Sequence, residues 1–174
     1  LSDVKTRCIA VDGANRKWMG TNNGVFLISN DCNTLIQHFT TENSPLLSNT
    51  VYDICVDDNS NIVYFATERG LCSYASDATQ PSEEMIKDNV YAYPNPVTPE
   101  YTGKITIVGL SFNADVKIVT SNGALVNQGR STGGSYQWDG RDLKGKRVAS
   151  GVYMVQAATE TGDKGVVCRI AVVN

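Results

Sequence analysis

The chain has 174 residues, of which 41% are hydrophobic and 19% charged, with a formal net charge of −3. This composition is that of a folded protein, and it argues against nucleic-acid binding, which needs clustered positive charge. The longest apolar runs are strand-sized, and Arg169 interrupts the last of them, so no membrane span is predicted. The chain begins at Leu1 without a methionine or a signal-like segment, so we expect a fragment or processed product whose export signal lies upstream.

Residues 1–76 contain an internal repeat, with copies at 1–45 and 46–76. Each copy has an Ile-x-Val-Asp motif, followed further along by a threonine and then a glycine. The aligned pairs are Ile9 with Ile54, Asp12 with Asp57, Thr21 with Thr67, and Gly24 with Gly70. A repeat of about 45 residues built from short strands is typical of β-propeller blades.

Each copy is predicted to form short strands separated by Asp, Asn and Gly turns. The predicted strands are 6–11, 17–21, 25–29 and 34–40 in the first copy, and 52–56, 62–67 and 71–74 in the second. A closed propeller needs about four to eight blades, so two copies form an incomplete propeller. Exposed blade edges then predict self-association of this fragment.

Residues 77–89 are polar and carry Pro81, which predicts a linker with one helical turn around Glu83 to Ile86. Glu83 and Glu84 are interpreted as solvated linker residues rather than a catalytic pair, because nothing folds around them to shift a pKa. The prolines of Tyr93-Pro94-Asn95-Pro96 then open a second domain. Proline fixes φ and lacks a donor, which suits an opening segment or an edge strand.

Residues 90–174 are predicted to form an immunoglobulin-like β-sandwich, since short strands alternate with Asn-Gly, Gly-Gly, Asp-Gly and Lys-Gly turns. The predicted strands are 104–108, 115–119, 124–126, 135–138, 151–158 and 165–173. The fold class is therefore all-β, with two propeller-type blades followed by the sandwich.

Enzyme signatures such as GxSxG, HExxH, a P-loop or a Rossmann fingerprint are absent from the sequence. We therefore predict no catalytic, cofactor or metal site, although a carboxylate-only glycosidase built with blades outside this chain stays open. A Cys–His pair would have to use His38, and we reject it. Without a CxxC pair the cysteines do not predict zinc, and we expect buried free thiols, because Cys8, Cys55 and Cys168 lie in apolar runs.

Three further segments each allow two interpretations. The oxygen-rich run from Asp57 to Asn61 is predicted to be a turn, with calcium binding as the alternative. Trp138 is predicted to be a core residue followed by an Asp139-Gly140 turn, with sugar stacking as the alternative. The basic stretch from Arg141 to Arg147 is predicted to be a solvated hairpin, with docking to an acidic surface as the alternative.

The first domain resembles a known propeller repeat. Ile-x-Val-Asp, WMGTNNG at 18–24 and FTTENSPLLSN at 39–49 resemble the two-component-regulator type repeat, which is common in outer-surface and sensor proteins of the Bacteroidetes. The second copy departs from this pattern, because VYFAT at 63–67 stands where the family usually has Trp-Ile-Gly-Thr. The second copy still has the β-branched and aromatic residues that favour a strand at these positions.

The second domain resembles the C-terminal sorting domains of cargo exported by type IX secretion, and the related FlgD-like immunoglobulin fold. The resemblance rests on YPNP, DVKIVTSNGALV, WDGRDLKGKRVASGVYMVQA and KGVVCRIAVVN, in this order. It implies that a Gly-Val-Tyr strand and a final basic-hydrophobic strand take part in recognition by the export machinery. The matching positions here are Gly151, Val152, Tyr153, Arg169, Ile170 and Val172. Arg169 replaces a frequent lysine and keeps the charge.

The two domains together resemble a surface component of type IX secretion. The resemblance implies a non-enzymatic protein of the periplasm or cell surface, whose partners are the secretion machinery or outer-membrane surface components and whose propeller is a binding platform. Exported cargo of the same pathway is equally compatible. Two alternatives stay open: the ligand-sensing propeller of a periplasmic hybrid two-component system, and a surface glycan-binding protein with polysaccharide as its partner.

Overall fold

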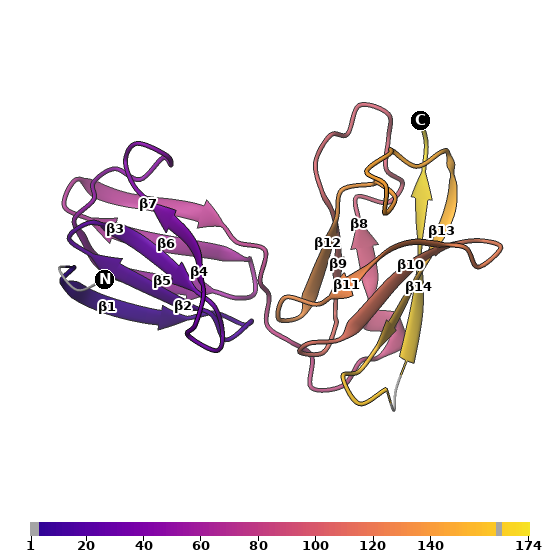
Figure 1. Cartoon of the computed structure of the whole chain (residues 1–174), viewed down its shortest axis with the longest axis horizontal. Coiled ribbons are helices and arrows are strands. Elements are labelled where there is room, and N and C mark those ends of the chain that lie inside the picture. Colours follow the sequence, from indigo (N-terminus) through magenta and orange to yellow (C-terminus); the bar gives the residue numbers. More distant parts are fainter. Residues whose placement is uncertain (1–3, 163–164) are drawn as a thin grey trace. The chain divides into compact units, whose positions relative to one another are not determined.

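The computed structural model describes residues 4–162 and 165–174 and is built almost entirely from antiparallel strands (Figure 1). The predicted all-β class is therefore confirmed. The chain divides into two compact units, Leu1–Gln80 and Pro81–Asn174. This division falls inside the segment 77–89. No helix among the described residues has the length and hydropathy needed to span a membrane.

The first unit consists of two antiparallel sheets that follow the sequence repeat. The first sheet has the order β1-β2-β3-β4 and the second the order β5-β6-β7. Their strands are β1 (Thr6–Val11), β2 (Lys17–Thr21), β3 (Gly24–Ile28), β4 (Leu35–Phe39), β5 (Val51–Asp57), β6 (Ile62–Thr67) and β7 (Gly70–Ala75). The opening strand of each sheet shifts register near its start, between Thr6 and Cys8 and between Val51 and Asp53. The repeat therefore extends to the details of strand pairing.

One aromatic cluster holds these two sheets together. Trp18 is buried on β2, stacks on Phe39 with ring centroids 5.6 Å apart, and lies 5.8 Å from the ring of Phe65 on the second sheet. Val51 and Ile54 of β5 belong to the same cluster. Because both sheets contribute to it, their facing sides form a common core.

A buried charge network fixes the turn after β1. The Asp12 carboxylate is inaccessible and accepts hydrogen bonds from Arg16 Nε at 2.8 Å and Trp18 Nε1 at 2.9 Å. Arg16 also binds Asp77 at 2.7 Å and Ser76 at 3.0 Å. Burial lowers the pKa of Arg16, but the charges of Asp77 and Asp12 outweigh it and the net shift is upward. A buried carboxylate is tolerated only with such partners.

The second unit also consists of two antiparallel sheets, in the orders β12-β9-β8 and β11-β10-β13-β14. Its strands are β8 (Tyr91–Tyr93), β9 (Ile105–Val108), β10 (Asp115–Thr120), β11 (Leu125–Arg130), β12 (Ser135–Trp138), β13 (Gly151–Ala158) and β14 (Gly165–Val172). A single core draws Ile105 and Ile107 from the first of these sheets and Ile118, Val155 and Ile170 from the second. The two sheets therefore pack face to face.

The proline segment runs along the edge of β14. The peptide bonds Tyr93–Pro94 and Asn95–Pro96 are both cis. The Asn95 side chain donates to the Arg169 carbonyl and accepts from the Ala171 amide, both at 2.9 Å. Val97 then pairs in parallel with Val172. These contacts tie the segment to the second unit.

The predicted helical turn at Glu83 to Ile86 is wrong in position. Ile86 has extended dihedrals (φ −104°, ψ 130°), and the helical turn is a 3₁₀ turn, η1 (Lys87–Asn89). Met85 is buried in the core of the second unit, and the Ser82 amide donates to the Leu110 carbonyl at 2.8 Å. These contacts hold the residues before Lys87 against the second unit, so that the helical turn begins only at Lys87.

The expectation of buried thiols is also wrong for part of the set. All five cysteines are free, but Cys32 and Cys55 are exposed, and Cys8, Cys72 and Cys168 are partly buried. Cys55 lies on a strand next to the buried Ile54, and successive strand residues face opposite sides. An apolar run on a strand therefore does not place every member in the core.

Candidate functional site

The structure places the predicted sorting residues on two neighbouring strands. Gly151, Val152 and Tyr153 open β13, and Arg169, Ile170 and Val172 lie near the end of β14. In the antiparallel register Gly151 is opposite Val172, and Tyr153 is opposite Ile170. Segments that are distant in sequence are thus brought together.

Only part of this set is accessible. Tyr153, Ile170 and Val172 point into the core, whereas Val152 and Arg169 are exposed. Val152 is opposite Ala171, and Arg169 is two residues before Ala171 on β14. Val152 and Arg169 therefore share the outer face of the sheet, because alternate residues of a strand lie on the same side. A folded partner can therefore contact Val152 and Arg169, while the other three side chains serve packing.

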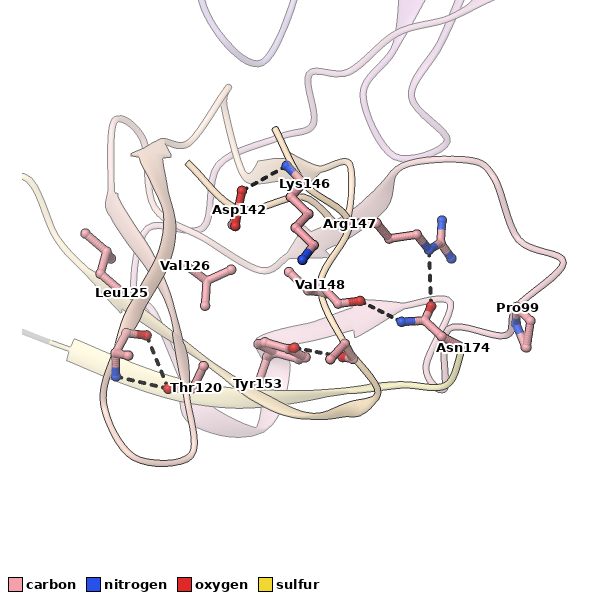
Figure 2. A pocket seen from close by; sticks show the side chains of 12 residues that line it. Pro99, Thr120, Leu125, Val126, Asp142, Lys146, Arg147, Val148, Tyr153 and Asn174 are labelled. Atoms are coloured by element: carbon pink, nitrogen blue, oxygen red, sulfur yellow. Dashed lines mark hydrogen bonds between the residues drawn. The ribbon is translucent and has the colours of Figure 1, made fainter. Parts of the chain in front are cut away.

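A pocket that sequence reasoning missed lies beside Tyr153 (Figure 2). It has a volume of about 800 Å³, within the range of roughly 300–1,000 Å³ found for ligand pockets. Its lining comes from separate segments: Pro99, the end of β10, the turn and start of β11, Asp142, residues 146–149, Tyr153 and Asn174. The GKRVAS run supplies residues 146–149, and neither its charge nor its place in the resemblance predicts that it packs beside the start of β11.

The floor of the pocket is apolar and well supported. Val126 and Val148 are buried, and Leu125 is half-exposed at its side. The Tyr153 hydroxyl donates to the Ala149 carbonyl at 2.8 Å. Burial raises the pKa of Tyr153 above its ordinary value. The floor offers a preformed surface for an apolar group.

The rim of the pocket is formed by the basic hairpin. Its turn is closed by Asp142, whose carboxylate accepts from the Lys144 and Lys146 amides, both at 2.9 Å. Gly145 has φ +79°, the left-handed conformation that glycine tolerates best. The predicted hairpin is thus observed, with an antiparallel bridge between Arg141 and Arg147 and exposed residues 143–147. In Figure 2 the Lys146 side chain extends from the hairpin toward Val148.

Arg147 joins the hairpin to the end of the chain. Its Nε donates to the Asn174 side-chain oxygen at 3.1 Å, and its terminal nitrogen donates to the Tyr101 carbonyl at 3.4 Å. Asn174 in turn donates to the Val148 carbonyl at 2.6 Å. Arg147 is therefore held by neutral acceptors, and its charge is not balanced by a carboxylate among the described residues.

Trp138 is a core residue, as predicted. It is 1% exposed, packs against the Tyr153 ring at 5.6 Å, and donates through Nε1 to the Arg141 carbonyl at 2.7 Å. Gly140, with φ +71°, turns the chain behind it. A ring buried on this scale cannot stack on a sugar.

The oxygen-rich run after β5 is a turn, as predicted. The Asp57 carboxylate accepts from the Asn59 amide at 3.1 Å and the Ser60 hydroxyl at 2.6 Å. Asp58 accepts from the Gly13 amide at 2.7 Å, which links the turns of the two repeats. Burial raises the pKa of Asp58, whereas the Ser60 hydrogen bond lowers that of Asp57.

No protein-family model and no curated protein matches the chain. Among solved structures it is similar to PorZ of Porphyromonas gingivalis, with 38% identity over 98% of this chain and a TM-score of 0.66. PorZ is described as an essential bacterial surface component of the type-IX secretion system. The chain spans 23% of the PorZ chain. The fold of this chain is therefore similar to that of one part of PorZ.

Two other solved structures match more weakly. One is the extracellular domain of a putative hybrid two component system from B. thetaiotaomicron, with 13% identity, a TM-score of 0.35, and coverage of 100% of this chain and 26% of that one. The other is dimeric latent PorU from Porphyromonas gingivalis, with 17% identity, a TM-score of 0.37, and coverage of 64% and 12%. At these TM-scores, neither similarity supports a conclusion about this chain.

Proposed function

We propose that this chain is part of a non-enzymatic type IX secretion protein of the periplasm or cell surface. In this proposal the second unit is recognised or retained by the secretion machinery, and the first is a binding platform. The observation that carries the proposal is the 38% identity to PorZ over 98% of this chain, which includes both units. The functional boundaries proposed for the two domains are 1–76 and 90–174.

The sheets of the first unit are proposed to be propeller blades. Equivalent residues of the repeat support this: Ile54 faces the neighbouring sheet and is 7% exposed, whereas Ile9 is 60% exposed on the outer side. Val25 is fully buried between the sheets, whereas its equivalent Leu71 is 68% exposed. The two outer faces of this pair of sheets thus carry apolar residues at the positions that the inner faces use for packing. Further sheets of the same type could pack on these outer faces, as neighbouring blades do in a propeller.

The second unit is proposed to be an immunoglobulin-like sorting domain. Its sheets of three and four antiparallel strands enclose one core with Trp138 in it, and this arrangement is compatible with that architecture. Val152 and Arg169 are the accessible members of the predicted recognition set, and we propose them as its contact residues.

A chimera tests the secretion role. In Porphyromonas gingivalis, the segment of PorZ that this chain matches is replaced by residues 1–174. We expect type IX cargo to reach the cell surface, and the same chimera carrying residues 1–80 alone to fail. Cargo that stays inside cells containing normal amounts of the full chimera would contradict the proposal.

A reporter separates a secretion component from cargo. The full chain is fused behind a periplasmic reporter in a host with an intact type IX system. If the second unit is a sorting signal, the reporter reaches the surface, and the double substitution Val152→Asp with Arg169→Glu reduces its export. Lys117→Glu, which changes an exposed charge on β10, is the matched control. If the reporter stays periplasmic while the chimera supports secretion, the chain belongs to a component of the secretion system and not to exported cargo.

A further inference from the structure

The pocket beside Tyr153 has an unbalanced charge. Lys146 and Arg147 both line it, and Asp142 is the one acidic side chain among the described residues that do so. The Asp142 carboxylate is engaged by backbone amides of its own hairpin. Neither cation forms an ion pair with a described residue. An apolar floor beside two such cations is complementary to a ligand that has both apolar and anionic groups.

The neighbouring strand offers a second type of contact. β11 is an edge strand, paired with β10 on one side and with no strand on the other among the described residues. Its first residues, Leu125 and Val126, belong to the pocket lining. An unpaired edge presents backbone N–H and C=O groups that can pair with an extended chain. A peptide added to this edge would pass the pocket.

We propose that the pocket and the outer edge of β11 bind an extended acidic peptide segment of a partner protein. The segment adds to β11 as a further strand, inserts an apolar side chain over Val126, Val148 and Tyr153, and places a carboxylate near Lys146. The inference rests on the proposed recognition role of the second unit and names the chemistry of the partner.

The edge of β11 favours a peptide over a lipid surface. Anionic headgroups would satisfy the two cations, but they cannot use the backbone groups of an edge strand. A neutral glycan would leave both cations unbalanced. A peptide that carries both apolar and acidic residues can contact the floor and the cations with its side chains, and the edge with its backbone.

Binding is tested on the full 174-residue chain by amide chemical-shift changes. The probe is the capped peptide acetyl-(Val-Glu)₄-amide, and acetyl-(Val-Lys)₄-amide is the charge control. A third peptide, acidic and N-methylated on alternate backbone nitrogens, cannot form strand pairs on its modified side. Phosphatidylglycerol vesicles provide the lipid arm. We expect shifts in β11 and residues 146–149 with the acidic peptide, and at least about fivefold weaker binding of the lysine and N-methylated peptides.

The variant Lys146→Glu is expected to weaken binding of the acidic peptide about fivefold to tenfold. The matched control is Lys144→Glu, which makes the same charge change in the same hairpin outside the pocket. Both variants should keep the melting temperature of the parent chain, since the Lys146 ammonium has no ion-pair partner among the described residues.

The inference would be overturned if the lysine peptide or the N-methylated peptide bound as tightly as the acidic peptide. It would also be overturned if Lys146→Glu and Lys144→Glu weakened binding equally. Vesicle binding that depends on Lys146, with no binding of the acidic peptide, would contradict it as well. The secretion role is judged separately by the chimera. A chimera that fails while the acidic peptide binds would remove the secretion proposal and leave this site in place.

Discussion

At the scale of single residues, Asp12 is the clearest example of a residue whose role depends on its partners. Its carboxylate is fully buried and holds both the Arg16 guanidinium and the Trp18 indole. The Ile-x-Val-Asp motif marked this aspartate as part of the repeat, but its equivalent Asp57 is solvated and caps a turn instead.

We therefore expect Asp12→Ala to lower the free energy of unfolding by about 3–5 kcal/mol, because it leaves a buried guanidinium and a buried indole N–H without their acceptor. Urea denaturation followed by tryptophan fluorescence measures this. Glu42→Ala, at an exposed position of the same unit, should change stability by less than about 0.5 kcal/mol. Equal effects of the two substitutions would show that the Asp12 network does not stabilise the fold.

The cysteines provide a second prediction at the residue scale. Cys32 and Cys55 are exposed, whereas burial raises the pKa of Cys168 to about 11. A raised pKa means that Cys168 becomes a thiolate only as the pH approaches 11, and the thiolate is the reactive form. In a short iodoacetamide pulse at pH 8, mass spectrometry should find Cys32 and Cys55 labelled and Cys168 at least tenfold less. Comparable labelling of Cys168 in the folded protein would contradict its burial.

At the scale of elements, the two sheets of the first unit use the same turn in different surroundings. Gly24 and Gly70 open equivalent strands with φ of +90° and +123°. A Cβ on Gly24 would overlap the Phe39 carbonyl oxygen, because β4 pairs with β3 in the first sheet. At Gly70 the nearest contact would be the Leu47 side chain at 3.5 Å, because β7 has no such neighbour in the second sheet.

This difference gives a matched pair of substitutions. Gly70→Ala should cost about 1–2 kcal/mol from its unfavourable φ alone. Gly24→Ala should cost at least about 2 kcal/mol more, since the β3–β4 pairing must also shift. Thermal and urea unfolding of both variants measures the difference. If both substitutions lower the free energy of unfolding by the same amount, the β3–β4 pairing around Gly24 does not add to the cost of a side chain at that position.

At the scale of the whole molecule, the beginning of the second unit separates the sequence-based boundary from the structural one. The sequence pattern places the second domain at 90–174, whereas the compact unit begins at Pro81. Met85 belongs to the core of that unit, and Ser82 donates to Leu110 within it. The segment before residue 90 therefore contributes to packing.

A chain of residues 81–174 should fold by itself and be more stable than residues 90–174 by about 2–5 kcal/mol, the usual loss when a buried methionine is removed. Urea denaturation of the two fragments measures this. The variant Met85→Ala in 81–174 should account for most of the difference, and Lys87→Ala, at an exposed position, should not. Equal stability of the two fragments would place the boundary at residue 90.

The sequence by itself determined the all-β class, the internal repeat and nearly every strand, because alternation and turn residues act locally. It also identified Trp138 as a core residue. Only the tertiary structure decided which apolar residues are covered, since Ile9 and Ile54, or Leu71 and Val25, have the same local pattern and opposite exposure. The same holds for the pocket, whose lining is assembled from residues between Pro99 and Asn174. Such contacts depend on how the two sheets pack and on where the hairpin folds back, and neither is encoded in a local pattern.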